Sequence, residues 1–255
     1  DDNAYDAEGQ DKPDMNLPFG QDELIKAVAK ANARTVVVLY GGGPADMTQW
    51  AARVKGIIQA GYPGQEGGNA LAEIIFGDVN PSGKLTVTFP KKLADVPAHK
   101  LGEYPGDSVN VHYKDDIFVG YRYYDTYNVK PLFPFGHGLS YTSFRYSNLS
   151  AVNHNGQVSV TVRIQNTGKK AGAEVVQLYV RDRKSSLKRP DKELKAFEKV
   201  FLAPGESKEL SFDLGSDAFS FFNEDRMQWV QEPGDFDILV GSSSRDIRAR
   251  HALNL

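Results

Sequence analysis

The 255-residue sequence contains no cysteine, which excludes disulfide bridges, thiolate metal sites and a cysteine nucleophile. It also has no apolar run near the roughly 18 residues that a membrane-spanning helix needs. The formal net charge is only −3, and no block of like charges offers a footprint for nucleic acid. We therefore expect neither a membrane protein nor a nucleic-acid-binding protein.

The start of the chain lacks the features of a native N-terminus. Residues 1–14, DDNAYDAEGQDKPD, contain no initiator methionine and neither the basic nor the apolar part of a signal peptide. This stretch is typical of the interior of a longer chain, so we expect further sequence before residue 1. Localisation stays open on these observations.

Cofactor and metal motifs are also lacking. Glycines 41–43 follow an apolar segment, but a GxGxxG pattern that starts at Gly41 would need glycine where Asp46 stands. The glycine-rich turn at 64–68 contains Glu66, whose carboxylate would repel a phosphate, and we expect Glu66 to cap the helix that follows. The five histidines are scattered, His137 among them, and no GxSxG motif is present. We expect no cofactor and no metal.

The first 142 residues alternate helical and strand patterns, which is typical of a parallel α/β domain. Apolar residues recur at helical spacing in three segments, 21–31, 49–60 and 68–76, with Gly77 placed to end the last one. Runs rich in β-branched residues predict two strands, 35–40 and 85–89, the first of them buried on both faces. Two parallel strands are too few for such a domain. We therefore expect the rest of the sheet to lie in sequence outside this chain.

Residues 91–116 form a long polar stretch without periodicity. Irregular loops of this length in compact domains are often functional. A surface connection between two domains is the plain alternative.

The remaining residues, 143–255, show the period of two that marks β-strands. In VSVTVRI, residues 158–164, every second side chain is a valine or isoleucine, and similar runs occur at 176–180, 210–214 and 236–240. Asn155-Gly156 predicts a hairpin, and residues 203–206, APGE, predict a turn. The pattern predicts an antiparallel β-sandwich of the immunoglobulin or fibronectin type III kind.

A cluster of acids near the start of the chain bears on chemistry. Asp6, Glu8 and Asp11 surround a glycine. Taken alone, the cluster is compatible with a solvated acidic loop, and equally with one member of a glycosidase carboxylate pair whose partner lies elsewhere.

Three longer segments together resemble glycoside hydrolase family 3, and its β-glucosidases most closely. They are GYPGQEGGNALAEIIFGDVNPSGKLTVTFP, DDIFVGYRYYD and PFGHGLSYTSF, in the order and spacing of the family. The matching motifs extend from about residue 5 to residue 142, and the sandwich resembles the fibronectin type III-like domain that many members carry. The resemblance implies an α/β fold, a partial parallel-sheet α/β sandwich domain over 1–142, followed by an all-β domain over 143–255.

The resemblance also implies roles for particular residues. In such β-glucosidases the acid/base Glu often lies in a segment like SEGxDRxxLxLP, and AEGQDKPDMNLP, residues 7–18, is similar to it. By this match Glu8 is the acid/base. The sequence departs from the pattern at Ala7, Lys12 and Met15, and lysine lacks the planar fork of arginine at position 12. The YPGQEGG turn is part of the scaffold in the family, so no catalytic role falls to Glu66.

Members of the family carry the nucleophilic Asp on a (β/α)8 barrel that this chain does not contain. The resemblance therefore implies an exo-acting retaining β-glucosidase that is active only with a companion chain or segment bearing the barrel. β-Xylosidase or another exo-glycosidase is the alternative specificity. Tyr104 and Tyr113, from the 91–116 loop, are candidates for the aglycone side of the substrate site. The resemblance favours a secreted or periplasmic location.

A non-catalytic carbohydrate-binding or interaction module is the rival hypothesis from another class, because fold alone does not determine function. An exposed aromatic strip on the sandwich would favour it. The candidate residues, for which core packing is the alternative use, are Tyr179, Phe219, Phe221, Phe222 and Trp229.

Overall fold

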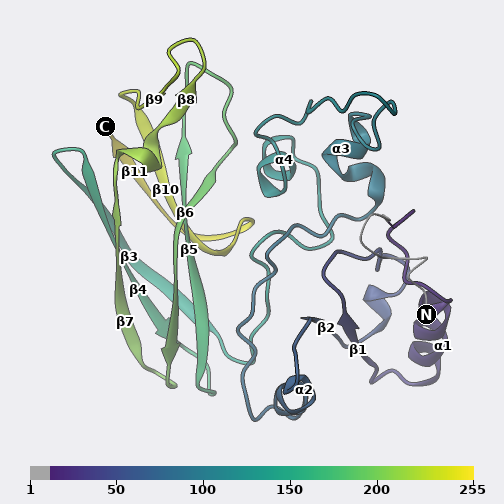
Figure 1. Cartoon of the computed structure of the whole chain (residues 1–255). Helices are drawn as coiled ribbons and strands as arrows, with labels where there is room; N and C mark the ends of the chain where they lie inside the picture. The colour runs from purple at the N-terminus through teal and green to yellow at the C-terminus, as the bar shows by residue number, and fades with distance from the viewer. Residues whose placement is uncertain (1–11) are drawn as a thin grey trace. The chain divides into compact units, whose positions relative to one another are not determined.

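The computed structural model describes residues 12–255, which form two compact units interleaved along the chain (Figure 1). Of the described residues, the first unit holds those up to Ala72 together with Thr88–Asp116 and Lys130–Phe133. The second unit holds Glu73–Val87, Ile117–Val129 and Pro134–Leu255. Within the described part of the chain, no helix is long and apolar enough to cross a membrane. The division into domains at residue 142 stays a prediction.

The first unit contains a small parallel sheet with a helix before it. Helix α1 (Gln21–Ala31) has the predicted bounds, with two acids in its first turn and Lys30 in its last, an arrangement that favours the helix dipole. Strand β1 (Val36–Tyr40) pairs in parallel with strand β2 (Gly56–Gly61). Two parallel strands therefore exist, as the sequence predicts, but the second one is not the predicted segment.

The helix predicted over 49–60 is wrong. The segment forms a short 3-10 helix, η1 (Ala51–Arg53), and then enters strand β2, where Ile57 lies opposite Val37. Two β-branched isoleucines flanked by Gly56 and Gly61 suit a strand, since glycine weakens a helix interior by about 1 kcal/mol. Pairing with β1 decides the outcome, and a periodicity pattern contains no information about that pairing.

The strand predicted over 85–89 is also wrong. Only Phe89 forms an isolated antiparallel bridge, with Phe133, while the Leu85 N–H donates to the carbonyl of His137. The segment lies between Pro81 and Pro90 and meets irregular chain rather than another strand. A β-branched composition alone is therefore insufficient here, because a strand also needs a neighbouring strand.

Strand β1 is less buried than predicted. The sequence predicts burial on both faces, yet Val36 and Tyr40 are exposed and only Val37 is fully buried. In the described part of the first unit, this sheet consists of the two strands β1 and β2.

Helix α2 (Gly67–Phe76) starts one residue before the predicted 68–76 and ends where predicted. Gly77 has a φ of 84°, and its N–H donates to the carbonyl of Glu73 at 3.0 Å. The Asp78 N–H donates to the same carbonyl at 2.8 Å. These bonds confirm Gly77 as the left-handed residue that ends the helix. The 91–116 stretch contains only two short elements, η2 (Leu93–Asp95) and α3 (Pro97–Lys100).

The second unit is built on a sandwich of two antiparallel sheets, which confirms the predicted fold. One sheet has the order β3-β4-β7 and the other has the order β11-β10-β5-β6. The bounds of these strands are as follows: β3 Phe144–His154, β4 Gln157–Asn166, β5 Gly172–Asp182, β6 Glu193–Leu202, β7 Ser207–Leu214, β10 Asp235–Ser243 and β11 Asp246–Asn254.

Both predicted turns are present in the sandwich. Asn155 and Gly156 have φ values of 54° and 93° and join β3 to β4, as a two-residue hairpin requires. The Glu206 N–H donates to the Ala203 carbonyl at 3.0 Å and closes the turn between β6 and β7. Three short elements lie between β7 and β10: η3 (Ser216–Phe219), β8 (Phe221–Asn223) and β9 (Gln228–Val230).

The core of the second unit lies between the two sheets. The four alternating residues of β4, Val158, Val160, Val162 and Ile164, have no solvent exposure. Each such side chain contributes about 1.5–3 kcal/mol when fully buried. Strand β5 is buried on both faces over most of its length, because residues of the same unit from 117–129 and 134–136 contact its outer face. The helix of that covering segment is α4 (Tyr121–Thr126).

Candidate functional site

The proposed acid/base, Glu8, lies outside the described residues 12–255. The later part of its segment, up to Pro18, is described and held by the first unit. The Met15 carbonyl accepts a bond of 2.7 Å from the Asp46 N–H, and the Leu17 N–H donates to Asp22 at 3.1 Å. The chain that follows Glu8 is therefore fixed to the body of the first unit at two points.

Asp22 is the centre of this attachment. Its carboxylate accepts the Leu17 N–H on one oxygen and the Trp50 indole N–H on the other, the latter at 2.6 Å. Trp50 is completely buried and Asp22 is nearly so. Asp22 is a residue that motif reasoning missed, since the sequence shows it only as an acid in the first turn of a helix.

The two aglycone-side candidates both lie on the 91–116 loop, in the first unit. Tyr104 is 43% exposed, and its ring lies 5.0 Å from that of His99. Tyr113 is 85% exposed. Between them, Asp107 accepts bonds from the Val109 and Asn110 N–H groups, which lower the pKa of its carboxyl. The loop thus presents both rings to solvent.

The glycine-rich turn before α2 has a packing explanation. A β-carbon on Gly67 would lie 2.6 Å from the ring of Pro63, so only glycine fits there. The Glu66 carboxylate accepts a bond of 2.6 Å from the Asn69 amide, and its carbonyl accepts the Ala70 N–H. Glu66 therefore lies at the start of the helix as predicted, but its carboxylate bonds a side-chain amide and not the backbone N–H groups that a cap would satisfy.

The segment DDIFVGYRYYD, residues 115–125, forms α4 and anchors it within the second unit. The Leu194 N–H donates to the Tyr121 hydroxyl at 2.7 Å, and the Tyr121 ring stacks on Phe135. Asp125 pairs with Lys192 at 3.0 Å and with Arg245 at 2.6 Å. Burial raises the pKa of Tyr121, so its hydroxyl stays protonated. These residues therefore stabilise the packing of α4 within the second unit.

The segment PFGHGLSYTSF, residues 134–144, is also closely packed within the second unit. Gly136 has a φ of 78°, and a β-carbon there would overlap the Gln177 amide. The same amide donates to the carbonyls of Gly136 and Ser242. Burial, with a smaller contribution from Lys84, lowers the pKa of His137. Among the described residues, no group of three or more His, Asp or Glu is arranged to hold a metal ion.

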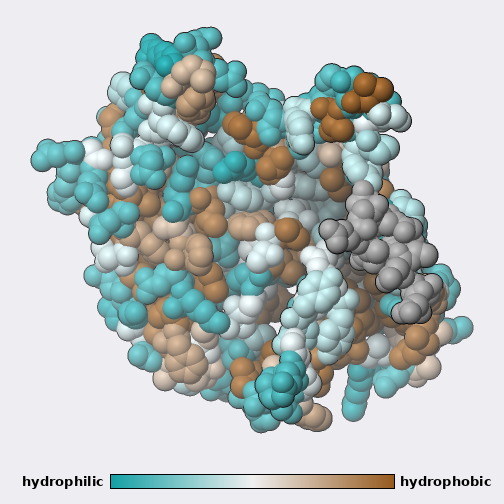
Figure 2. Space-filling model, viewed as in Figure 1, coloured by the Kyte–Doolittle hydropathy of each residue, from teal (hydrophilic) through white to brown (hydrophobic). Residues whose placement is uncertain are grey.

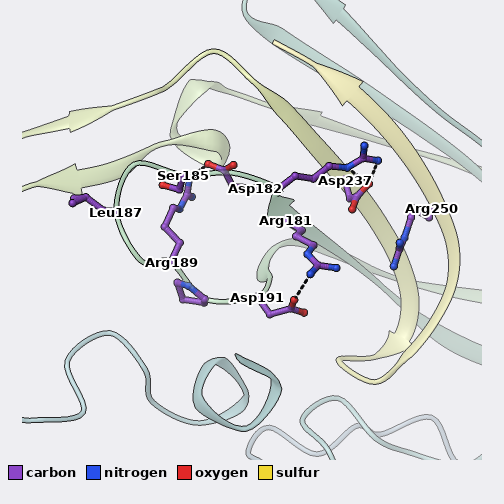
Figure 3. A pocket seen from close by; sticks show the side chains of 10 residues that line it. Arg181, Asp182, Ser185, Leu187, Arg189, Asp191, Asp237 and Arg250 are labelled. Atoms are coloured by element: carbon purple, nitrogen blue, oxygen red, sulfur yellow. Dashed lines mark hydrogen bonds and ion pairs between the residues drawn. The ribbon is translucent and has the colours of Figure 1, made fainter. Parts of the chain in front are cut away.

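The second unit contains cavities, and two of them are defined by their lining residues. One, of about 360 Å³, lies beside His137, Glu174 and Arg248. The other, of about 430 Å³, lies where β5, β10 and β11 expose charged side chains (Figure 3). Neither contains a carboxylate pair that we assign to glycoside hydrolysis.

The aromatic residues considered for a binding strip divide into two groups. Tyr179, Phe219 and Phe221 are buried, which confirms core packing for these three. Phe222 and Trp229 are exposed on the β8–β9 hairpin, where their rings contact each other at 5.8 Å. Two residues on one hairpin do not make a strip along a sheet, so the five candidate residues do not supply the feature that would favour a binding module.

Known proteins similar to this chain include beta-glucosidases. "Thermostable beta-glucosidase B" of Acetivibrio thermocellus is 49% identical over 255 residues, 98% of this chain and 33% of that protein. "Beta-glucosidase BoGH3A" of Bacteroides ovatus is 48% identical over 249 residues, 95% of this chain and 33% of that protein. The chain thus spans about a third of the length of these curated relatives.

A solved structure and two sequence profiles agree with these relatives. The GH3 beta-glucosidase of Bifidobacterium adolescentis superposes with a TM-score of 0.95 at 43% identity, over 99% of this chain and 37% of that one. Residues 174–244 match the fibronectin type III-like domain. Residues 1–141 match the glycosyl hydrolase family 3 C-terminal domain, and the chain therefore belongs to glycosyl hydrolase family 3.

Proposed function

We propose that this chain supplies the acid/base half of the active site of an exo-acting retaining β-glucosidase. The observation that carries the proposal is the similarity to named beta-glucosidases over 98% of the chain, which includes the segment of Glu8. The substrate is a β-linked glucoside or oligosaccharide, cleaved at its non-reducing end. The family membership equally admits β-xylosidase or another exo-glycosidase, and the sugar preference depends on residues of the barrel.

The mechanism requires two carboxyl groups about 5–5.5 Å apart. One, an Asp on the companion chain or segment that carries the (β/α)8 barrel, attacks the anomeric carbon and forms a covalent glycosyl intermediate. Glu8 protonates the leaving oxygen, and then removes a proton from the water that hydrolyses the intermediate. Glu8 must be protonated before the first step, so its pKa must be raised in the assembled site.

The described structure supports this proposal because the segment that contains Met15 and Leu17 is attached to the body of the first unit. An acid/base carboxyl must be held in place to transfer a proton efficiently. The bonds at Met15 and Leu17 provide an anchor seven to nine residues after Glu8. Tyr104 and Tyr113 are exposed on the 91–116 loop, as aglycone-binding rings must be before assembly. The 91–116 loop therefore fits the leaving-group side of the site.

A chimera tests the role of Glu8. This chain replaces the matching third of the Acetivibrio thermocellus relative, which supplies the barrel. We expect Glu8→Ala to reduce the kcat on cellobiose by about 10²–10⁴-fold, the usual contribution of general acid–base catalysis. Activated aryl glucosides should lose much less rate, because their leaving groups need no proton, and azide should restore their turnover.

The matched control is Glu23→Ala, which removes an exposed glutamate of α1 that pairs with Lys26. We expect this variant to keep the activity of the unchanged chimera. Full activity of Glu8→Ala on cellobiose would disprove the assignment. A folded chimera that carries the unchanged chain and is inactive on every β-glycoside tested would contradict the proposed function itself.

A further inference from the structure

Charged residues gather on the outer face of the four-stranded sheet, where β5 ends and β10 begins. Arg181 of β5 lies opposite Asp237 of β10, which in turn lies opposite Ala252 of β11. Residues opposite each other, and residues two apart in one strand, share a face of a sheet. Arg250, two residues before Ala252, therefore projects from the same face as Arg181 and Asp237.

These side chains and the loop after β5, residues 183–191, line an open cavity of about 430 Å³. Figure 3 shows Arg181 and Arg250 extending from their strands on either side of the open space, with Asp237 between them. The volume lies in the range of about 300–1,000 Å³ that is typical of small-molecule sites. The cavity therefore has room for a small ligand.

Three of the four arginines that line the cavity are neutralised within it. Their ion pairs are Arg181–Asp191 at 2.9 Å, Arg183–Asp237 at 2.5 Å and Arg189–Asp182 at 3.1 Å. The side chain of Arg250 makes no hydrogen bond or ion pair with any residue in the described range 12–255, although it is exposed and lines the same space. The lining thus has one positive charge in excess, and Arg250 carries it.

The arginines differ in how many donors remain available. Arg189 is nearly buried and also donates to the carbonyls of Phe219 and Ser220, so its guanidinium serves the fold. Arg181 is 39% exposed, and its ion pair with Asp191 leaves other N–H donors of its guanidinium unused. Arg250 offers the whole fork of its guanidinium, which matches the two oxygens of a carboxylate. A carboxylate ligand would consequently meet Arg250 first.

The remaining lining suits a polar, hydroxylated ligand. The Ser185 hydroxyl is shielded from solvent and has no hydrogen-bond partner in the described part of the chain. A buried hydroxyl without a partner costs free energy, which a hydrogen-bonding ligand would recover. Apolar lining is limited to Leu187 and Pro190, too little for a lipid or an aromatic ligand. Arg–Asp pairs, by contrast, offer both donors and acceptors to neighbouring hydroxyl groups.

We propose that this cavity binds a sugar acid, a hydroxylated monocarboxylate of the uronic acid class. The carboxylate pairs with Arg250, and the ring hydroxyls bond to the Arg181–Asp191 pair and to the Ser185 hydroxyl. One excess positive charge matches one carboxylate. The proposal does not depend on the glycosidase function, because binding here requires no companion chain and no catalytic residue.

Isothermal titration of the 255-residue chain with glucuronate at low salt tests the proposal. We expect saturable binding, with much weaker binding of glucose and of the methyl ester of glucuronate, since both lack the charge. Arg250→Gln should raise the Kd at least about tenfold, and Arg250→Lys should fall between this variant and the unchanged chain, because lysine keeps the charge but not the fork.

The matched control is Arg163→Gln, which removes the same charge from an exposed position of β4 on the other sheet, where the side chain bonds Ser207. This control should bind glucuronate like the unchanged chain. Amide resonances in NMR spectra report folding of every variant, and shifts on titration should concentrate in residues 183–191 and around Arg250. Three results would overturn the proposal: no saturable binding, equal affinity for acetate or for the methyl ester, or an Arg250→Gln variant that binds normally.

Discussion

Asp22 shows how a single buried carboxylate can connect a flanking segment to a folded body. Its two oxygens take one donor from the chain at Leu17 and one from the buried Trp50. Nothing about an aspartate in the first turn of a helix identifies this role in the sequence. The connection arises because η1 brings Trp50 beside α1. Asp22 and Trp50 are 28 residues apart in the sequence.

Replacing Asp22 with alanine should destabilise the first unit by about 2–4 kcal/mol, because two buried or half-buried donors lose their partner. Fluorescence of Trp50 during urea unfolding measures this, in a Trp229→Phe background that leaves Trp50 as the single tryptophan. Glu23→Ala, one residue along α1 on the solvent side, should leave the transition nearly unchanged. If Asp22→Ala has the same unfolding midpoint as the Trp229→Phe background protein, the two hydrogen bonds of Asp22 make no net contribution to stability.

At the scale of elements, α4 is held by one buried aspartate. Asp125 pairs with Lys192 before β6 and with Arg245 in the β10–β11 turn, and Arg245 also donates to the carbonyls of Tyr124 and Val129. A helix of six residues has little stability of its own. Its position on the outer face of the sheet therefore depends on these side-chain bonds and on the rings of the same segment.

Replacing Asp125 with asparagine should weaken this attachment by about 3 kcal/mol, since among residues 12–255 it leaves the buried Lys192 with the partly exposed Asp191 as its one ion-pair partner. Hydrogen exchange at the Leu194 and Asp191 amides, which bond to α4 side chains, measures the local opening free energy. Glu198→Gln, which breaks the exposed pair with Lys208, is the control and should not change exchange there. Unaltered protection in Asp125→Asn would assign the attachment to ring packing instead.

At the scale of the whole molecule, the first unit exposes apolar side chains that a complete domain would cover. They include Phe19, Leu24, Val28, Val36, Tyr40 and Tyr62. Brown patches of hydrophobic residues also interrupt the visible surface in Figure 2. Within residues 12–255, the sheet of the first unit has two parallel strands, which is below the size that is stable alone in water. Exposed apolar surface of this kind marks an interface.

We therefore predict a native mass well above 28.1 kDa when the protein is purified from its source, with the barrel present on a second, larger chain or on a segment joined to this one. Native mass spectrometry measures the assembly and identifies the chain in which the nucleophile should be found. The isolated chain should not hydrolyse β-glucosides, because one carboxylate of the pair is missing. A monodisperse 28.1 kDa monomer would contradict this prediction and would favour the binding-module hypothesis.

The sequence by itself determined those features that depend on local chemistry. Alternation along 158–164 predicted the buried face of β4, Asn155-Gly156 predicted the hairpin, and Gly77 predicted the end of α2, because periodicity and left-handed backbone act over a few residues. The order of the motifs also identified the family. The role of Glu8 rests on that resemblance and stays a proposal.

Only the tertiary structure decided the features that depend on which distant residues meet. Pairing with β1 made residues 56–61 a strand, and the lack of a partner strand kept 85–89 irregular. The same holds for the Asp22–Trp50 bond and for the excess charge at Arg250, whose neighbours come from three strands and a loop. Long-range pairing releases far more free energy than the propensity of a short segment, and a linear pattern cannot reveal which partners will supply it.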